Sequence, residues 1–395
     1  MLTEAQKEEA VKLTRELISH PSNSGDEEGV AKALQKYMKD NGWDEVVIDK
    51  YGSVIGTIKG KRPGPHLLYD GHIDTVPVPD ASVWTHDPYA GDVADGKIYG
   101  RGASDMKGAV AAMACAATNF AKATGRDFAG SVSVAGVVYE ELFEGVAARE
   151  ISELLKPDIV VIGEASELNL KVGQRGRAEV VLETQGVPAH SANPDKGVNA
   201  VHSMIAFVNE VEKIVPGEQP VLGKGVSVLT DIISTPYPGA SVVPSGCRAT
   251  YDRRLLVGET LENVIAPYRE AAARAAKAHP QFKGDASYAK AALKCYTGAT
   301  IEGERFFPGW LYDVNEEFIQ KALAGLRSAG LAPEISHYSF CTNGSHYAGE
   351  AGIKTFGFGP SRENLAHTID EHIETDQLNK VLAGYFGINK SLLGG

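Results

Sequence analysis

A histidine and two aspartates follow a short apolar segment early in the chain. The motif is Asp70-Gly71-His72-Ile73-Asp74, and the apolar residues are 66–69. His72 and Asp74 are two positions apart, so their side chains face the same side of an extended chain. A metal-binding histidine commonly has a carboxylate on its second ring nitrogen, which Asp74 would supply. The alternative is a structural histidine followed by a helix-capping aspartate, and this motif leaves both interpretations open.

Two further acidic residues and a late histidine are of the metal-binding type. Asp105 stands at the start of a predicted helix, where it could cap the helix or bridge two metal ions with its two oxygens. Glu164 comes just after the apolar segment 158–162, and His367 lies in the run Ala366-His367-Thr368. Taken singly, each is a weak signal that a cap, a solvated loop or a surface histidine also explains.

The adjacent pair Glu140-Glu141 follows the apolar segment 130–138. Two neighbouring carboxylates at a strand end repel each other unless a positive charge compensates them. A metal would do so, with one carboxylate as a ligand and the other free to transfer protons. The alternative is a solvated acidic loop that also contains Glu144.

Together, ligand-type residues recur at successive predicted strand ends, which is where sites form in open α/β sheets. They would make two nitrogen- and oxygen-ligated sites that share Asp105, with the ligands His72, Asp105, Glu141, Glu164 and His367. Such ligands suit zinc, manganese or cobalt. The sequence has no Gly-x-Ser-x-Gly, Walker, Gly-x-Gly-x-x-Gly or His-Glu-x-x-His motif, so the corresponding chemistries lack support.

The elements that would position these residues predict an α/β protein with a mainly parallel sheet and helices on both faces. Apolar strand segments alternate with helical patterns, and the clearest are strands 130–138 and 158–162 with helices 106–123 and 145–155. Pro63-Gly64-Pro65 is expected to break the chain before the strand at 66–69.

The pattern changes over residues 176–295, which we expect to form an inserted α+β domain. This stretch holds predicted strands at 177–185, 225–233, 246–253 and 287–295 and predicted helices at 197–213 and 260–278. A helix at 313–329 and a strand at 353–358 then resume the first pattern. The expected division is therefore 1–175 with 296–395, interrupted by 176–295.

Charge and composition exclude several classes of function. The 395 residues carry a net charge of −12, from 39 basic and 51 acidic residues, which disfavours binding to nucleic acid or to an anionic membrane. No apolar run approaches the ~20 residues that span a bilayer. The four cysteines are widely spaced and the N-terminal segment is not of the signal-peptide type, so we expect a reduced, cytoplasmic protein.

The ordered set of motifs resembles the M20 family of metallopeptidases and amidohydrolases. The resemblance rests on His72-x-Asp74, the run from Gly100 to Gly108, Glu140-Glu141, Gly163-Glu164 and His367, and it covers nearly the whole chain. It implies a di-metal catalytic domain interrupted by a smaller lid domain that commonly dimerises. The stretch 176–295 falls where that lid belongs, so the expected partners are a small-molecule substrate and a second copy of the chain.

The resemblance also implies roles for individual residues. His72 and Glu164 would hold one metal, Glu141 and His367 the other, and Asp105 would bridge them. Glu140 would be the general base and then acid, and Asp74 would orient His72. In the lid, His190 would help to bind the scissile carbonyl, often across the dimer, and Arg254 would bind a substrate carboxylate.

Two departures from the family pattern lie on the substrate side. Ser241-Val242-Val243-Pro244 stands where the family often has an Asn-Val-Ile-Pro-like run. The resemblance thus implies that an asparagine contact to the substrate is missing or replaced. Asn343-Gly344-Ser345 replaces a Thr-Asp-containing glycine loop and resembles the branch of YgeY-like hydrolases. Substrate binding by Asn343, Gly344 and Ser345 is expected on this basis.

These features predict a hydrolase that uses two divalent ions, zinc or alternatively cobalt or manganese, and Glu140 to cleave an amide bond. The expected substrate is a small N-acyl or N-carbamoyl amino acid or a dipeptide with a free carboxylate. One alternative is a metal-dependent deaminase or lactam-opening hydrolase on the same scaffold. Another is a catalytically inactive binding protein.

Overall fold

Contacts along the chain divide the structure, a computed structural model that describes residues 2–394, into two units. The first unit comprises Met1–Gln174, Ala292–Glu302 and Leu311–Gly395, and the second comprises Arg175–Ala291 and Gly303–Trp310. The second unit is thus inserted in the chain of the first. Residues 292–302 return to the first unit as the tip of a hairpin, a local excursion that the expected division at 295 did not include. The roles of the units as catalytic and lid domains remain predictions.

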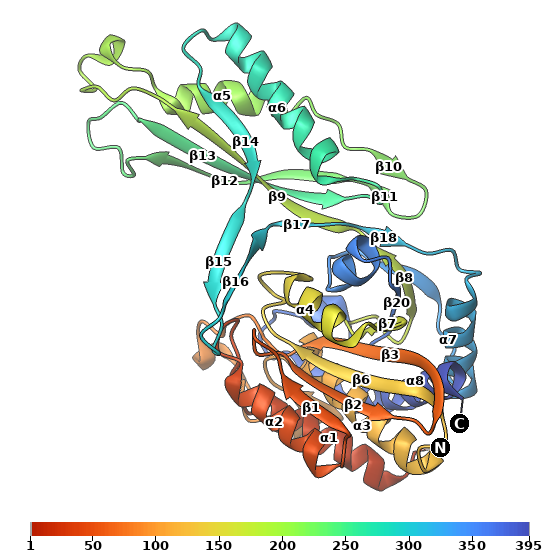
Figure 1. Ribbon diagram of the computed structural model, residues 1–395. Helices are drawn as coiled ribbons and strands as arrows, with labels where there is room; N and C mark the ends of the chain where they lie inside the picture. The colour runs from red at the N-terminus through yellow and green to blue at the C-terminus, as the bar shows by residue number, and fades with distance from the viewer. Residues whose placement is uncertain (1, 395) are drawn as a thin grey trace. The chain divides into compact units, whose positions relative to one another are not determined.

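A nine-stranded sheet forms the centre of the first unit, in the order β1-β2-β6-β3-β7-β20-β8-β18 with β19 beside β8 (Figure 1). The bounds are β1 Glu45–Ile48, β2 Val54–Lys59, β3 Arg62–His72, β6 Ala129–Val137, β7 Ile159–Ile162, β8 Leu170–Gln174, β18 Trp310–Leu311, β19 Ile335–Tyr338 and β20 Lys354–Gly357. Strands β6, β3, β7 and β20 are parallel neighbours, whereas β1 and β2 are antiparallel additions. The predicted α/β class with a mainly parallel sheet is confirmed.

Helices cover both faces of this sheet, with α4 on the face opposite α3 and α8 (Figure 1). The bounds are α1 Glu4–Ile18, α2 Glu28–Asp40, α3 Gly108–Thr124, α4 Val146–Leu155, α7 Glu317–Ser328 and α8 Thr375–Leu393. The small side chains of α3 let it approach the sheet closely, and every residue from 108 to 121 is buried. At the contact, a Cβ on Gly71 would lie 2.8 Å from side-chain atoms of Met106 and Val110, so only glycine fits there.

Successive side chains of β3 point to opposite faces of the sheet, and this decides which of them lie on the α4 side. His66 faces α4, where its Nδ1 lies 3.1 Å from the Leu155 carbonyl oxygen. Tyr69 faces α8, and its hydroxyl donates to the side chain of Asn389 at 2.8 Å. Asp70 and His72 alternate with Tyr69 and therefore share the α4 side. The expected break at Pro63-Gly64-Pro65 is wrong, since β3 runs through it with a register shift between Arg62 and His66.

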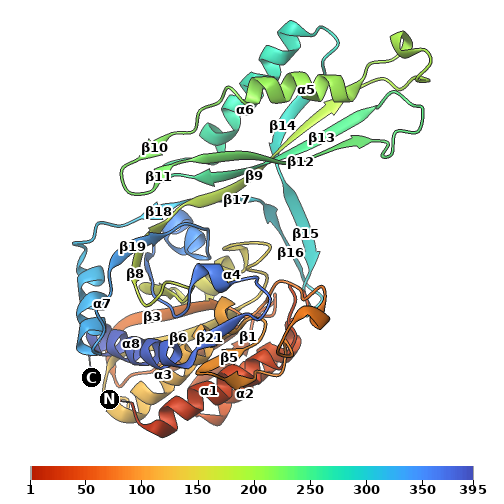
Figure 2. The same ribbon diagram turned by 180° about the vertical axis from the view of Figure 1, so that it is seen from behind.

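The second unit is a five-stranded antiparallel sheet with two helices packed on it (Figure 2). The strand order is β12-β13-β9-β14 with β17 beside β9, and the bounds are β9 Gly176–Gln185, β12 Val226–Thr235, β13 Gly246–Leu255, β14 Gly284–Tyr288, β17 Phe306–Phe307, α5 Ala200–Val211 and α6 Leu261–Ala278. Its core includes Phe207, Tyr251 and Tyr268. The hairpin strands β15 (Lys290–Lys294) and β16 (Thr300–Glu304) follow β14. Within residues 2–394, no helix has the length and apolarity needed to cross a membrane.

Candidate metal centre

The predicted ligands converge because three of them come from neighbouring parallel strands. His72 is the last residue of β3, Glu141 follows β6, and Glu164 follows β7. These strands adjoin in the order β6-β3-β7 and run parallel, so their carboxyl ends meet at one edge of the sheet. Asp105 enters from the loop before α3, and His367 enters from the loop after β20.

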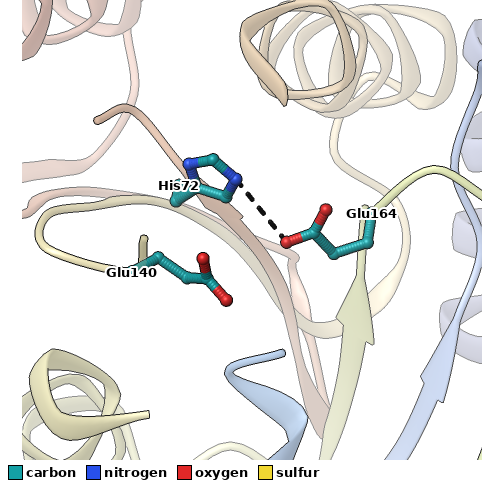
Figure 3. A group of neighbouring side chains, drawn as sticks. All are labelled: His72, Glu140 and Glu164. Carbon is teal, nitrogen blue, oxygen red and sulfur yellow. Dashed lines mark ion pairs between the residues drawn. The ribbon is translucent and has the colours of Figure 1, made fainter. Parts of the chain in front are cut away.

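Asp105 stands between the two histidines. Its Oδ1 lies 2.9 Å from His72 Nε2, and its Oδ2 lies 3.1 Å from His367 Nε2. The Oε2 of Glu141 is also 3.1 Å from His367 Nε2, whereas the Oε1 of Glu164 is 3.6 Å from His72 Nε2 (Figure 3). The structure therefore brings all five residues together as two groups joined by Asp105.

Glu140 lies beside the His72 group. Its carboxylate is directed towards the space between His72 and Glu164 (Figure 3). Potential ligand atoms of these three residues lie within 4.8 Å of one another, as do those of His72, Asp105 and Glu141. Glu141 pairs with His367, whereas among the described residues no hydrogen bond or ion pair joins Glu140 to His367. Glu140 is thus near enough to act on a molecule held by the group.

The electrostatics of the centre favour a bound cation. Burial raises the pKa of Glu140 well above its usual value and that of Glu164 to about 8. Burial also raises the pKa of Glu141. Buried carboxylates this close together are stable in their ionised form only when positive charge compensates them. The imidazole and carboxylate donors fit divalent zinc, manganese or cobalt.

Asp74 holds both the histidine and the Glu140-Glu141 loop. The backbone N–H groups of Glu140 and Glu141 donate to its carboxylate at 3.0 and 3.2 Å, and the Ser24 hydroxyl does so at 2.7 Å. His72 Nδ1 lies 2.9 Å from the main-chain oxygen of Asp74 and 3.6 Å from its Oδ1. Asp74 therefore orients His72 through its main chain. This contact puts the proton on Nδ1, which leaves Nε2 free to bind a metal.

Glu371 is a supporting residue to which the sequence analysis gave no role. Its Oε1 accepts the backbone N–H groups of Ser104 and Asp105 at 2.9 and 3.0 Å, and its Oε2 pairs with Arg101 at 2.5 Å. Both side chains of this ion pair are buried. Glu371 fixes the backbone that presents Asp105, yet it is separated from Arg101 by 270 positions in sequence. No local spacing links the two residues.

The predicted substrate residues of the first unit have structural partners. Asn343 is 2 % exposed, donates to Asp70 at 2.9 Å and accepts from the Gly145 N–H at 2.8 Å. Gly344 donates its N–H to Thr342, and Ser345 is buried. Asn343 therefore ties the loop that it occupies to β3 and to the start of α4. Binding of substrate by Asn343, Gly344 and Ser345 remains a prediction.

The two predicted lid residues belong to the second unit. His190 is exposed, and its Nδ1 accepts the N–H of Ala192 at 3.0 Å. In that arrangement the ring proton is on Nε2, which can donate outward. The Nε of Arg254 lies 2.9 Å from an oxygen of Asp252, and the Arg254 side chain is partly exposed. Their roles in catalysis remain predictions.

Comparison with known proteins confirms the resemblance. The model described as peptidase family M20/M25/M40 matches residues 68–389. The uncharacterised protein YgeY of Escherichia coli K12 is 33 % identical over 389 residues, which cover 97 % of this chain and 94 % of YgeY. A succinyl-diaminopimelate desuccinylase of Cereibacter sphaeroides is 27 % identical over 395 residues, with 96 % and 98 % covered.

Solved structures share the fold. The M20 family metallo-carboxypeptidase Sso-CP2 of Sulfolobus solfataricus superposes with a TM-score of 0.76 at 17 % identity, over 97 % of this chain and 99 % of that one. The YXEP protein of Bacillus subtilis, described as a dinuclear metal-binding peptidase of the M20 family, gives 0.70 at 15 % identity and 98 % coverage of both chains. At these identities the likeness concerns the fold.

Proposed function

The chain belongs to the peptidase family M20/M25/M40 and is a metallohydrolase of amide or peptide bonds, and from this premise we propose its substrate class and mechanism. It cleaves the amide bond of a small N-acyl or N-carbamoyl amino acid or a dipeptide. The observation that carries the proposal is Asp105 shared between His72 and His367, with Glu140 beside the group.

Two divalent cations in this centre would polarise the substrate carbonyl and lower the pKa of the attacking water. We assign His72 and Glu164 to one cation, Glu141 and His367 to the other, and Asp105 to both. Zinc is the cation we propose, with cobalt and manganese as alternatives that metal analysis distinguishes. After gentle loading, elemental analysis should give about two divalent ions per chain.

The residues of the chain carry the proton transfers and the binding. Glu140 accepts the proton of the attacking water and returns it to the leaving nitrogen. His190 donates its Nε2 proton to the developing oxyanion. Arg254 binds the carboxylate of the substrate, for which a guanidinium offers a bidentate geometry. Asp74 and Glu371 hold the backbone on which Glu140 and Asp105 depend.

A pair of matched variants tests the assignment of the two adjacent carboxylates. Glu140→Gln keeps the shape but deletes the base, so turnover should fall about 10²–10⁴-fold while the metal content stays unchanged. Glu141→Gln should instead lose metal, because Glu141 pairs with His367 in the described part of the chain and Glu140 does not. Elemental analysis and turnover on a panel of N-acyl amino acids and dipeptides measure both effects. The opposite pattern would show that the two roles are exchanged.

Product analysis on the same panel tests the bond that is cleaved. An N-acyl substrate should yield an acid and an amine in equal amounts. Release of ammonia from an N-acyl amino acid or a dipeptide, or opening of a ring without a second product, would identify the deaminase or lactam-opening alternative instead.

We also propose a cytoplasmic homodimer formed through the second unit. Strand β12 is at the edge of its sheet and exposes apolar side chains: Val228 is 49 %, Ile232 50 % and Ile233 48 % exposed. A long, apolar edge strand is a ready surface for pairing with a second copy. The four cysteines are buried and form no disulfide, which is compatible with a reducing compartment.

A further inference from the structure

Tyr139, the residue before Glu140, is held at both its backbone and its side chain. Its backbone N–H donates to Oε1 of the buried Glu27 at 3.3 Å, and its hydroxyl donates to the main-chain oxygen of Lys294 at 2.5 Å. Gly25 packs directly against this hydroxyl, because a Cβ at Gly25 would lie 2.5 Å from the tyrosine hydroxyl oxygen. The Tyr139 side chain is thus enclosed by two segments that are remote in sequence.

The backbone of Tyr139 needs such restraint. Its φ is +61°, in the left-handed region that a bulky aromatic residue rarely adopts. Conformations of this kind persist only where the surroundings fix them, and they gather at functional sites. Here three consecutive N–H groups are fixed by two buried carboxylates: that of Tyr139 by Glu27, and those of Glu140 and Glu141 by Asp74.

The hairpin that supplies the Lys294 oxygen is itself anchored to the first unit. Its tip lies against the turn after β1, where the Tyr296 hydroxyl donates to the Gly52 oxygen at 2.8 Å and the Thr297 hydroxyl donates to the Lys50 oxygen at 2.6 Å. Ile301 of β16 is fully buried. Residues 292–302 therefore form a fixed support and not a loose excursion of the chain.

We propose that Tyr139 is a positioning residue for Glu140 and that the β15–β16 hairpin holds it in place. The hydrogen bond from the hydroxyl to the Lys294 oxygen fixes the Tyr139 ring. The ring and Glu27 together fix the left-handed backbone of Tyr139. That backbone in turn sets the direction of the Glu140 side chain. Because the chain enters the hairpin from Ala291 and leaves it at Gly303, both in the second unit, the hairpin links that unit covalently to the support of Glu140. This inference rests on the proposed role of Glu140 as the base.

Two tyrosine-to-phenylalanine variants test it. Tyr139→Phe keeps the aromatic ring but removes the hydrogen bond from its hydroxyl to the Lys294 oxygen in the hairpin. The control, Tyr312→Phe, removes a comparable bond from a tyrosine hydroxyl to a main-chain oxygen, that of Ile353 at 2.8 Å. Ile353 precedes β20, so this bond is at the edge of the sheet opposite to the candidate centre. Tyr139→Phe should lower kcat about tenfold with KM and metal content unchanged, since a small displacement of a reacting group is costly. Tyr312→Phe should leave kcat within about twofold, because the bond that it removes is outside the reacting geometry.

Hydrogen exchange provides a readout that does not need activity. Faster exchange of the backbone amides of residues 139–141 in Tyr139→Phe, with those amides unaffected in Tyr312→Phe, supports the proposal. Equal kcat in both variants together with unchanged exchange would overturn it, as would loss of metal in Tyr139→Phe. If the wild-type enzyme hydrolyses no amide on the panel, the proposed function fails, while the exchange result still decides whether Tyr139 fixes this loop.

Discussion

Glu371 illustrates how one buried carboxylate can support a proposed metal ligand, Asp105, without being a ligand itself. It accepts the Asp105 N–H and pairs with Arg101, so its negative charge orders the loop and compensates the arginine. Breaking one side of a buried ion pair typically costs more than the pair contributes, because the remaining charge is left uncompensated.

Glu371→Gln should therefore lower both stability and metal affinity. We expect the free energy of unfolding to fall by about 3–5 kcal/mol, the range for a broken buried pair. Urea unfolding of the metal-free protein measures this loss, and a metal titration measures affinity. Glu317→Gln, which alters an exposed pair with Lys321, is the control and should change neither quantity. Unchanged metal affinity in Glu371→Gln would show that the Asp105 loop is held by other contacts.

At the level of single residues, the sequence indicates the ligands but not their supports. His72, Glu141 and Glu164 stand next to apolar strand segments, a local pattern that can be read directly. Glu371 and Tyr139 act through partners that only the folded chain brings near. Tyr139 meets Lys294 across 155 positions, and no spacing rule connects the two residues.

Among the elements, α4 and the helical turn Ser345–Glu350 are joined by a charged contact. Arg149 of α4 pairs with Glu350 at 2.7 Å, and Glu350 also meets the His346 ring at 2.8 Å. Burial alone would raise the pKa of Glu350, but the bonds with His346 and Arg149 lower it from 4.5 to about 2. Because the pKa is lower in the folded state, the ionised form stabilises the fold above pH 4.5, and this stability is lost as the pH falls towards 2.

Glu350→Gln should consequently destabilise the protein in a pH-dependent way. Arg149 is partly exposed, so we expect a loss of about 1 kcal/mol at pH 7. The difference from the wild type should shrink as the pH is lowered from about 4.5 towards 2, where the wild-type carboxylate becomes protonated. Urea unfolding at several pH values measures the difference. A constant difference across this range would contradict the assigned ionisation.

A strand or helix could be predicted from the sequence where its own residues carry the pattern of apolar side chains. The strands β6 and β7 and the helix α3 agree with the apolar runs that predict them. The single strand expected over 287–295 is divided between the end of β14 and β15, and β16 lies outside the expected elements. The turn between β15 and β16 contains Gly298 at φ +89°. Helix α8 lies outside the expected elements, although its buried Leu378, Val381, Leu382 and Tyr385 recur at helical spacing.

For the whole molecule, the proposed dimer can be tested with two matched substitutions on edge strands. Val228 on β12 and Val47 on β1 are each 49 % exposed, and each strand is at the edge of its sheet. Val228→Lys should convert the dimer to a monomer, because a buried lysine at the interface would lose its hydration. Val47→Lys should leave the dimer intact. Light scattering after size exclusion gives the mass, and a Val228→Lys variant that stays dimeric would place the interface elsewhere.

Mixed dimers test whether His190 acts across that interface. His190→Ala should reduce kcat about 10²–10³-fold, as for the loss of one oxyanion donor. Metal content should be unaffected, because His190 lies in the second unit and all five proposed ligands lie in the first. Mixing His190→Ala with Glu140→Gln chains should restore activity if the donor comes from the partner. After verified subunit exchange, no recovery would mean that His190 acts within its own chain or has no catalytic role.

The order of the ligands along the chain determines when each half of the centre can exist during synthesis. His72, Asp105 and Glu164 all precede the inserted unit, whereas His367 follows it. The roughly 200 residues between Glu164 and His367 take about 10–40 s to translate. During that interval the nascent chain contains every residue of the proposed His72 group but lacks the histidine of the other group, so the residues of the two halves become available one after the other.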